Sequence, residues 1–94
     1  MPLVHASYTV GTSAVVVVPH AGEHYHFIAV ANSGTKTAYL KMVPGDVPLS
    51  VTNGVPLPAG AAIVLDQDAT PILVAGVSAV CAGGESTTVA AQAY

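Results

Sequence analysis

Histidines are the first residues in this chain whose type and spacing could support chemistry. His24 and His26 lie two positions apart in a segment with strand-like alternation, and side chains at i and i+2 of a strand point to the same face. Two imidazoles placed in this way can share a metal ion, with His5 or His20 as a third ligand. No glutamate follows the pair, because residues 27–31 are apolar. We expect these histidines to be structural or solvent-facing, with no bound metal or cofactor, and a metal site at His24 and His26 is the alternative.

A second pattern that could hold a cation is the D-x-D sequence formed by Asp66 and Asp68. Calcium requires about six to eight oxygen ligands. Besides Gln67, this segment offers only backbone carbonyl groups in addition to the two carboxylates. We therefore expect a solvated turn here.

Nucleophilic and phosphate-binding chemistry lacks support in the sequence. Cys81 lies in the alternating apolar segment 77–82, has no base close to it in sequence, and is expected to be a small buried hydrophobic residue. The chain has no G-x-S-x-G pattern, and its Gly-rich turns join strands where a phosphate loop would need a following helix. The five carboxylates are scattered along the chain. We expect a protein that is not an enzyme.

The charge content is unusually low for a domain of this size. The chain has 94 residues, of which two are basic and five acidic, and 52% are hydrophobic. A typical soluble domain carries about 25% charged residues. One cysteine cannot form an internal disulfide, although small domains usually depend on disulfides, metals or partner chains. We expect a chain that covers much of its surface with other protein.

Three classes of function or location are disfavoured by the same composition. Lys36 and Lys41 are the two basic residues, too few for the clustered phosphate contacts of a nucleic-acid-binding protein. The uncharged stretches contain Pro, Gly, Ser and Thr, and none is an 18-residue apolar run. Residues 1–3 have no basic region of the kind that opens a secretory signal. We expect no nucleic-acid or membrane partner.

Short strands separated by turn residues account for most of the chain. Val, Ala, Thr and Ile dominate, Gly and Pro recur at short intervals, and no window shows a 3.6-residue apolar stripe. The expected strands are residues 4–10, 14–18, 23–32, 37–42, 47–51, 61–65, 72–74, 77–82 and 87–93. The sequence predicts an all-β chain with one domain over residues 1–94. We expect a small β-sandwich or jelly-roll of about seven to nine short, mainly antiparallel strands.

Turn residues predict how these strands are connected. Ser33-Gly34-Thr35 is expected to form a hairpin turn, and Pro44-Gly45-Asp46 and Asn53-Gly54 are further turn signals. Residues 55–60 are expected to form an extended corner, because each of its prolines fixes φ and lacks an amide donor. Residues 61–65 are expected to be a core strand.

The longest expected strand, residues 23–32, has two distinct faces. One face should carry Tyr25, Phe27, Ala29 and Ala31. The other should carry His24, His26, Ile28 and Val30. On the following strand, the expected inward side chains are Ala38, Leu40 and Met42.

Two segments in the middle of the chain resemble a known family. Residues 28–41 contain the pattern N-x-G-x-x-x-x-Y-L-K, and residues 53–66 contain N-G-x-P-L-x-x-G-x-x-x-x-L-D. Together they resemble the small β-sandwich accessory proteins of tailed-phage virions, namely the short head-decoration (cement) and head-fibre-like proteins, over roughly residues 27–82. The resemblance implies a capsid-bound, oligomeric structural protein. Any family contact made by arginine does not carry over, because this chain has no arginine.

The resemblance and the composition together predict a virion structural protein that decorates and stabilises, or cements, a tailed-phage capsid. The expected partners are the major capsid protein and copies of this chain, as a trimer or dimer. The expected location is the capsid exterior, after assembly in the reducing host cytoplasm. Residues 1–10 are expected to be an N-terminal arm or edge strand that pairs with a neighbour or a capsid loop. The interface candidates are Met1, Pro2, Leu3, Val4 and Tyr94.

Three other functions remain open from the sequence. The chain could be another virion adaptor, such as a head fibre, tail or baseplate part. It could be a carbohydrate-binding β-sandwich, although it has no tryptophan to form a sugar platform. The last alternative is a metal-dependent enzyme of cupin-like build.

Overall fold

A computed structural model describes residues 4–19, 25–42, 49–66 and 76–94 of the chain. The described residues form strands and turns, with no helix that could span a membrane. The strands are β1 (Val4–Val10), β2 (Val15–Val18), β3 (Phe27–Asn32), β4 (Ala38–Lys41), β5 (Val55–Leu57), β6 (Ala62–Asp66), β7 (Val77–Val80) and β8 (Thr87–Ala93).

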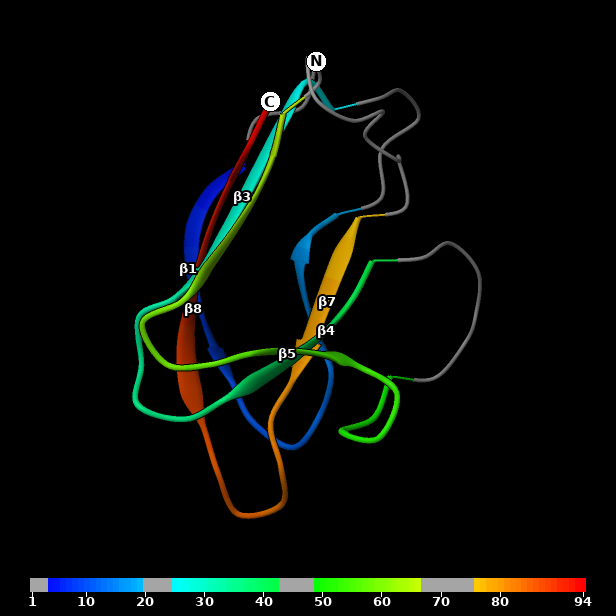
Figure 1. Cartoon of the computed structure of the whole chain (residues 1–94), viewed down its shortest axis with the longest axis vertical. Coiled ribbons are helices and arrows are strands. Elements are labelled where there is room, and N and C mark those ends of the chain that lie inside the picture. The colour runs from blue at the N-terminus through cyan, green and yellow to red at the C-terminus, as the bar shows by residue number, and fades with distance from the viewer. Residues whose placement is uncertain (1–3, 20–24, 43–48, 67–75) are drawn as a thin grey trace.

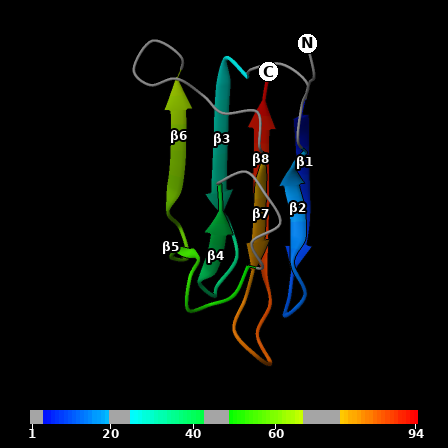
Figure 2. The same cartoon turned by 90° about the vertical axis from the view of Figure 1, so that its right-hand side faces the viewer.

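These strands form two four-stranded antiparallel sheets. Sheet A has the order β1-β8-β3-β6 and sheet B the order β2-β7-β4-β5, and the two sheets are the two layers seen in Figure 1 and, turned by 90°, in Figure 2. The first strand pairs with the last, the second with the seventh, the third with the sixth and the fourth with the fifth. This nested pairing of eight strands in two sheets is the jelly-roll arrangement. The predicted all-β sandwich is confirmed.

The predicted hairpin at Ser33-Gly34-Thr35 is wrong, because β3 belongs to sheet A and β4 to sheet B. The amide of Ser33 continues the sheet A ladder by donating to the carbonyl oxygen of Thr88, with an N–O distance of 2.9 Å. The chain then crosses the gap between the sheets. Segment 58–60 makes the return crossing from β5 to β6, with Gly60 at a φ of 81°. The corner predicted over residues 55–60 is therefore shorter than expected, because residues 55–57 form β5 and pair with β4.

Two strand predictions also differ from the structure. Residues 49–50 are outside any strand and residues 51–53 form a turn, because the carbonyl of Ser50 accepts hydrogen bonds from the amides of Asn53 and Gly54. The predicted core strand 61–65 is β6, which lies at the edge of sheet A. The turn expected at 44–46 and the strand expected at 72–74 lie outside the described residues.

The alternation predicted for the longest strand holds only from Phe27 onward. Ile28 and Val30 share one face, as predicted, and that face is the buried one. Tyr25 is buried and His26 is exposed, so each side chain lies on the opposite side from the one that the predicted alternation gives it. The reason is that the Tyr25 hydroxyl donates to the carbonyl oxygen of Pro19, which holds the ring against the core, while the chain bends at His26 before the strand begins.

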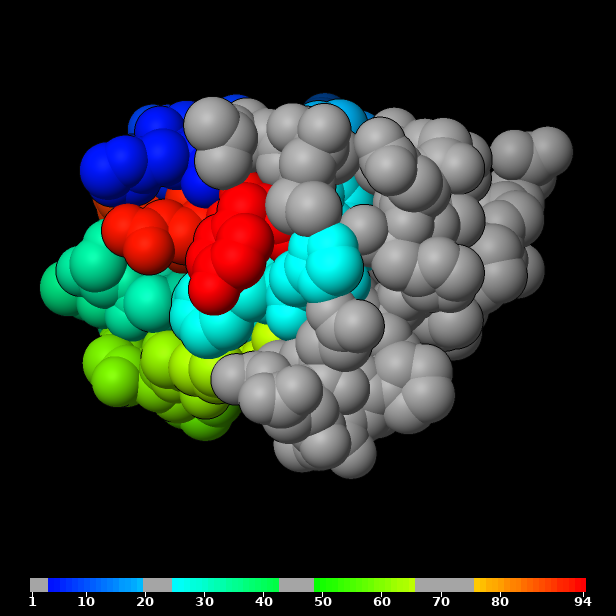
Figure 3. Space-filling model, turned by 90° about the horizontal axis from the view of Figure 1, so that it is seen from above, coloured from blue at the N-terminus to red at the C-terminus, as the bar shows by residue number. Residues whose placement is uncertain are grey.

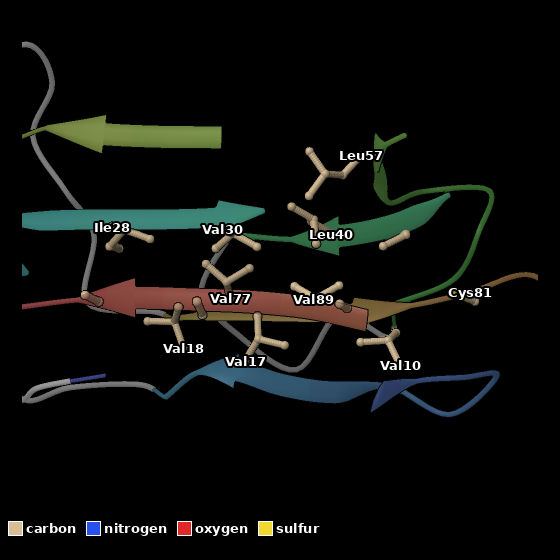
Figure 4. Close-up of a cluster of buried hydrophobic side chains, with 14 of the residues drawn as sticks. Val10, Val17, Val18, Ile28, Val30, Leu40, Leu57, Val77, Cys81 and Val89 are labelled. Atoms are coloured by element: carbon tan, nitrogen blue, oxygen red, sulfur yellow. The ribbon is translucent and has the colours of Figure 1, made fainter. Parts of the chain in front are cut away.

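The core fills the space between the two sheets, and Figure 4 shows its side chains pointing into that space from both layers. Sheet A contributes Val10, Ile28, Val30 and Val89, all at most 2% exposed. Each fully buried side chain of this size contributes about 1.5–3 kcal/mol by its removal from water. Ala38 and Leu40 are buried from sheet B as predicted, and the partly buried Met42 packs against the same cluster.

Asn32 joins the sheets at one end of this core. Its Oδ1 accepts hydrogen bonds from the Thr87 hydroxyl (2.7 Å) and the Gly34 amide (3.1 Å). Its Nδ2 donates to the carbonyl oxygens of Lys36 (2.6 Å) and Leu57 (2.8 Å). Because Thr87 belongs to sheet A and Leu57 to sheet B, a single buried amide links both layers and the segment that crosses between them.

Candidate interaction surface

The histidines that could bind metal are not brought together among the described residues. His5 is exposed on β1, and His26 is exposed just before β3. His20, His24 and Asp68 lie outside the described residues, while Asp66 ends β6. Within the described part of the chain, no three His, Cys, Asp or Glu residues gather as a metal site. The shared site at His24 and His26 stays a prediction.

Cys81 has the environment of a structural thiol. The side chain is buried at the end of β7, as predicted. Burial raises the pKa of Cys81, the negative charge of Glu85 raises it further, and a hydrogen bond with the backbone of Thr87 partly opposes the shift. Nucleophilic cysteines have lowered pKa values, so this thiol has the opposite character.

We expect the free energy of unfolding to fall as the pH rises above about 9. Burial raises the pKa of Tyr25 above 10.0, and the pKa of Cys81 is raised above 9.0. A group with a raised folded-state pKa contributes stability that is complete below its unfolded-state pKa and is lost as the pH climbs toward the folded value. Urea unfolding at about pH 7, 9 and 10.5 measures this slope.

Matched tyrosine variants separate the contribution of Tyr25. Tyr25→Phe should flatten the alkaline slope, in addition to a loss of about 0.5–1.5 kcal/mol at neutral pH because the hydrogen bond to the Pro19 carbonyl is lost. The half-exposed Tyr94 provides a control for the loss of a tyrosine hydroxyl, and Tyr94→Phe should change the free energy of unfolding at pH 7 by about 0.5 kcal/mol or less. A wild-type stability that stays constant from pH 7 to 10.5 would contradict the prediction.

The outer face of sheet A carries little charge. In the ladders of this sheet, the side chains that point away from the core are His5, Ser7, Thr9, Phe27, Ala29, Ala31, Ala62, Val64, Thr88, Ala90, Gln92 and Tyr94. None of these residues is Asp, Glu, Lys or Arg, and the register pairs Asp66, the last residue of β6, with Phe27 at one end of the face. The solvated face of an antiparallel sheet is usually polar. This composition therefore favours a face that contacts other protein.

Two aromatic rings lie at one end of this face. The rings of Phe27 and Tyr94 stack with centroids 5.4 Å apart and an interplanar angle of 17°. The backbones of the two residues are joined as well, because the Tyr94 amide donates to the Phe27 carbonyl at 3.0 Å. Figure 3 shows the C-terminal end of the chain (red) on the surface at this end of the molecule, beside β3 (cyan) and near β1 (blue).

The structure places two of the predicted interface residues at this same end. Val4 is half-buried against the core and pairs with Ala93, one residue before Tyr94. Tyr94 is 49% exposed. Met1, Pro2 and Leu3 lie outside the described residues. The N-terminal strand and the C-terminal aromatic ring therefore belong to one contiguous surface.

The four sheet edges differ in how they are protected against further pairing. In sheet B, β2 has a register shift between Val16 and Val18, and β5 is three residues long with Pro56 at its centre. Bulges, short strands and prolines are the devices that keep edges unpaired. Both edges of sheet A differ in this respect, because β1 pairs with β8 over seven residues without a register shift and β6 contains no proline. Further strand pairing is therefore favoured at sheet A.

The hydrogen-bond pattern identifies which groups of β1 lie at the free edge. The Thr88 carbonyl and the Tyr94 amide bond to residues in and next to β3. Because residues of an antiparallel strand alternate between its two neighbours, Val89 and Ala91 of β8 must bond to β1. Their partners in the β1 register are Tyr8 and Ala6. The amides and carbonyls of His5, Ser7 and Thr9 therefore point away from the sheet.

Sequence reasoning did not identify Val64 on β6 as part of this surface. It is 59% exposed, the highest value among the exposed large hydrophobic residues of the described chain. The continuous apolar run of residues 61–65 led to the prediction of a core strand, and only the sheet order shows that β6 is an edge.

No protein-family model, curated protein or solved structure matches this chain. The described residues form a small jelly-roll in which the outer face of sheet A carries little charge and the edge strands β1 and β6 pair with no further described strand.

Proposed function

We propose that this chain is a virion structural protein that decorates and stabilises a tailed-phage capsid by binding, as an oligomer, to the lattice of the major capsid protein. The observation that carries the proposal is the edge of β1, seven residues long and without Lys, Arg, Asp or Glu, beside an outer face that carries little charge. The resemblance of residues 28–41 and 53–66 to head-decoration proteins points in the same direction.

Strand addition is the binding mode that this edge supports. An extended capsid segment laid along β1 would meet the outward amides and carbonyls of His5, Ser7 and Thr9, and backbone hydrogen bonds would provide the affinity. Each such bond contributes about 0.5–1.5 kcal/mol net. Affinity per site is therefore modest, but an oligomer that engages several identical lattice sites at once binds much more tightly than one copy.

The low charge of the chain fits this role. Two basic and five acidic residues leave little charge to keep a free surface solvated, and an unprotected edge is a hazard in an isolated monomer. On a capsid, the β1 edge and the outer face of sheet A would be covered by other protein at every lattice site that a copy occupies. The properties that would make a free monomer prone to association thus become useful in a decorated shell.

A lysine at the free edge of β1 is expected to prevent lattice binding. Ser7 is exposed and its backbone groups face outward, so Ser7→Lys places a charge beside an incoming strand without removing a core contact. Binding to capsid shells assembled from the major capsid protein, measured as occupancy after sedimentation, should weaken by at least about tenfold, which corresponds to about 1.4 kcal/mol.

The matched control is Ser13→Lys, which makes the same substitution at an exposed serine between β1 and β2. This variant should decorate capsids as the wild type does. Deleting residues 1–3 tests the arm separately, because it leaves every described pair between β1 and β8 in place. The proposal fails if the wild type does not bind capsid shells, or if Ser7→Lys binds as well as Ser13→Lys.

A further inference from the structure

The second free edge of sheet A, β6, carries the most exposed large hydrophobic side chain in the described chain. Val64 points outward from the sheet and is 59% exposed. Its neighbours Ile63 and Leu65 point inward and are only partly buried against the core. Every residue of β6 before its last, Asp66, is apolar. This edge lacks the lysines, prolines and bulges that keep edge strands apart.

The backbone of β6 has hydrogen-bonding groups directed away from the sheet. The Asn32 amide donates to the Ala61 carbonyl at 2.9 Å, so Ala61 faces β3. Alternation along the antiparallel ladder then directs Ile63 and Leu65 toward β3 as well. The amide and carbonyl groups of Ala62 and Val64 therefore point outward along the free edge.

We propose that β6 pairs with β6 of a second copy of this chain, antiparallel and centred on Val64, so that sheet A continues across a twofold axis into the other copy. In this register Val64 lies opposite its symmetry mate, and Ala62 of each copy lies opposite Asp66 of the other. The outward groups of residues 62, 64 and 66 in the two strands form about six hydrogen bonds.

Two features select a second copy as the occupant of this edge. The first is self-complementarity, because a twofold contact requires each residue to meet a surface of its own kind, and a Val64 pair gives an apolar contact at the centre. The second is charge. The one ionisable residue of β6 ends the strand, so the antiparallel arrangement puts the two Asp66 residues at opposite ends of the shared ladder.

The size of the contact sets the strength of the dimer. A single shared strand pair buries less than the about 1,200–2,000 Å² that stable complexes bury. The dimer is therefore concentration-dependent, with a dissociation constant of micromolar order or weaker. This inference deepens the proposed function, because it names the surface through which copies of the decorating subunit associate. The dimer is argued from β6 itself, and only its biological role rests on the proposed function.

The test is the mass of the full chain in solution, measured by light scattering from about 10 μM to 1 mM, a range that brackets a weak dimer. The wild type should pass from monomer to dimer. Val64→Lys should remain monomeric throughout, with an unfolding midpoint close to that of the wild type because the side chain is mostly exposed.

Two matched variants locate the contact. Val16→Lys changes a valine with similar exposure, 56%, on the edge strand of sheet B that contains the register shift. Ala90→Lys places the same charge at the centre of the outer face of sheet A, away from the edge. Both should dimerise as the wild type does. The inference is overturned by a wild type that is monomeric at 1 mM, by a Val64→Lys variant that dimerises, or by an Ala90→Lys variant that is monomeric.

Hydrogen exchange provides a readout that needs no substitution. In the wild type, the amides of Ala62 and Val64 should become protected as the concentration rises through the dimerisation range, while the outward amides of Ser7 and Thr9 on β1 should not. Protection on β1 in place of β6 would overturn the inference. Failure of this dimer leaves the capsid measurement with Ser7→Lys unaffected, so the two proposals can fail separately.

Discussion

Replacing Gly34 with alanine is expected to cost at least about 3 kcal/mol of folding stability, which is a large share of the total for a small domain. A Cβ at this position would lie 2.0 Å from the Thr87 Oγ1 and 2.6 Å from the backbone nitrogen of Thr88. Rotating the Thr87 hydroxyl away would break its hydrogen bond to the Oδ1 of Asn32. Moving the Thr88 backbone would disturb the ladder between β3 and β8.

Gly11→Ala is the matched control for this substitution. A Cβ at Gly11 meets no heavy atom within 4 Å, and its φ is not in the positive range. Its unfolding free energy should stay within about 0.5 kcal/mol of the wild type, as for other surface substitutions. Urea unfolding of both variants measures the difference. A Gly34→Ala protein as stable as Gly11→Ala would show that the close approach between the 33–36 segment and β8 is wrong.

Asn32→Leu is expected to destabilise the domain by about 3–5 kcal/mol, even though leucine has a similar size and the site is fully buried. The substitution leaves the Leu57 carbonyl, the Lys36 carbonyl and the Thr87 hydroxyl without their present partner. Each buried group that loses its hydrogen bond costs about 1–3 kcal/mol. No buried side-chain polar atom in the described part of the chain lacks a partner, so the wild type bears no such cost there.

A double-mutant cycle with Thr87→Val tests whether this loss comes from the network. Thr87→Val removes one donor to Asn32, so its effect should be smaller in the Asn32→Leu background than in the wild type, by at least about 0.5 kcal/mol. Gln92→Leu, at an exposed position of β8, should change stability by about 0.5 kcal/mol or less. Fully additive effects of the Asn32 and Thr87 substitutions would refute the network as the cause.

The strands with clear alternation were predictable from the sequence. In β1, apolar and polar residues alternate, and in β8 buried side chains alternate with more exposed ones, because one face packs on the core and the other does not. The strand bounds expected for residues 4–10 and 87–93 agree with the structure. Turn residues spread along the chain, together with the absence of an apolar stripe at helical spacing, were also sufficient to predict the all-β class.

The connections between strands were not predictable, because local turn chemistry does not show which sheet a strand joins. Ser33-Gly34-Thr35 has the composition of a hairpin turn, yet its geometry is set by Thr87 and Thr88, more than fifty positions away in sequence. The available sequence signal for this crossing between the sheets was an Asn, buried in the structure, at the end of an apolar strand and followed by Gly. The same limitation made β6 a core strand in the sequence analysis, because periodicity describes the two faces of a strand and not its place in the sheet.

The candidate surface was predictable in part. Low charge indicated a protein-covered surface, and Val4 and Tyr94 were identified as interface candidates at positions that the structure places at one end of sheet A. The hydrogen-bonding direction of His5, Ser7 and Thr9 follows from the pairing of β1 with β8. β1 and β8 lie at opposite ends of the sequence, so no local sequence pattern predicts their pairing.

The position of β8 also determines when the domain can fold during synthesis. β8 lies between β1 and β3 in sheet A, so neither strand has its shared neighbour until residues 87–93 have left the ribosome. At about 5–20 residues per second, β1 waits for several seconds as an unpaired apolar segment. Ladders between distant segments also form slowly. Sheet A therefore cannot be completed until β8 has been synthesised, and a ribosome-bound chaperone would encounter β1 before its ladder with β8 exists.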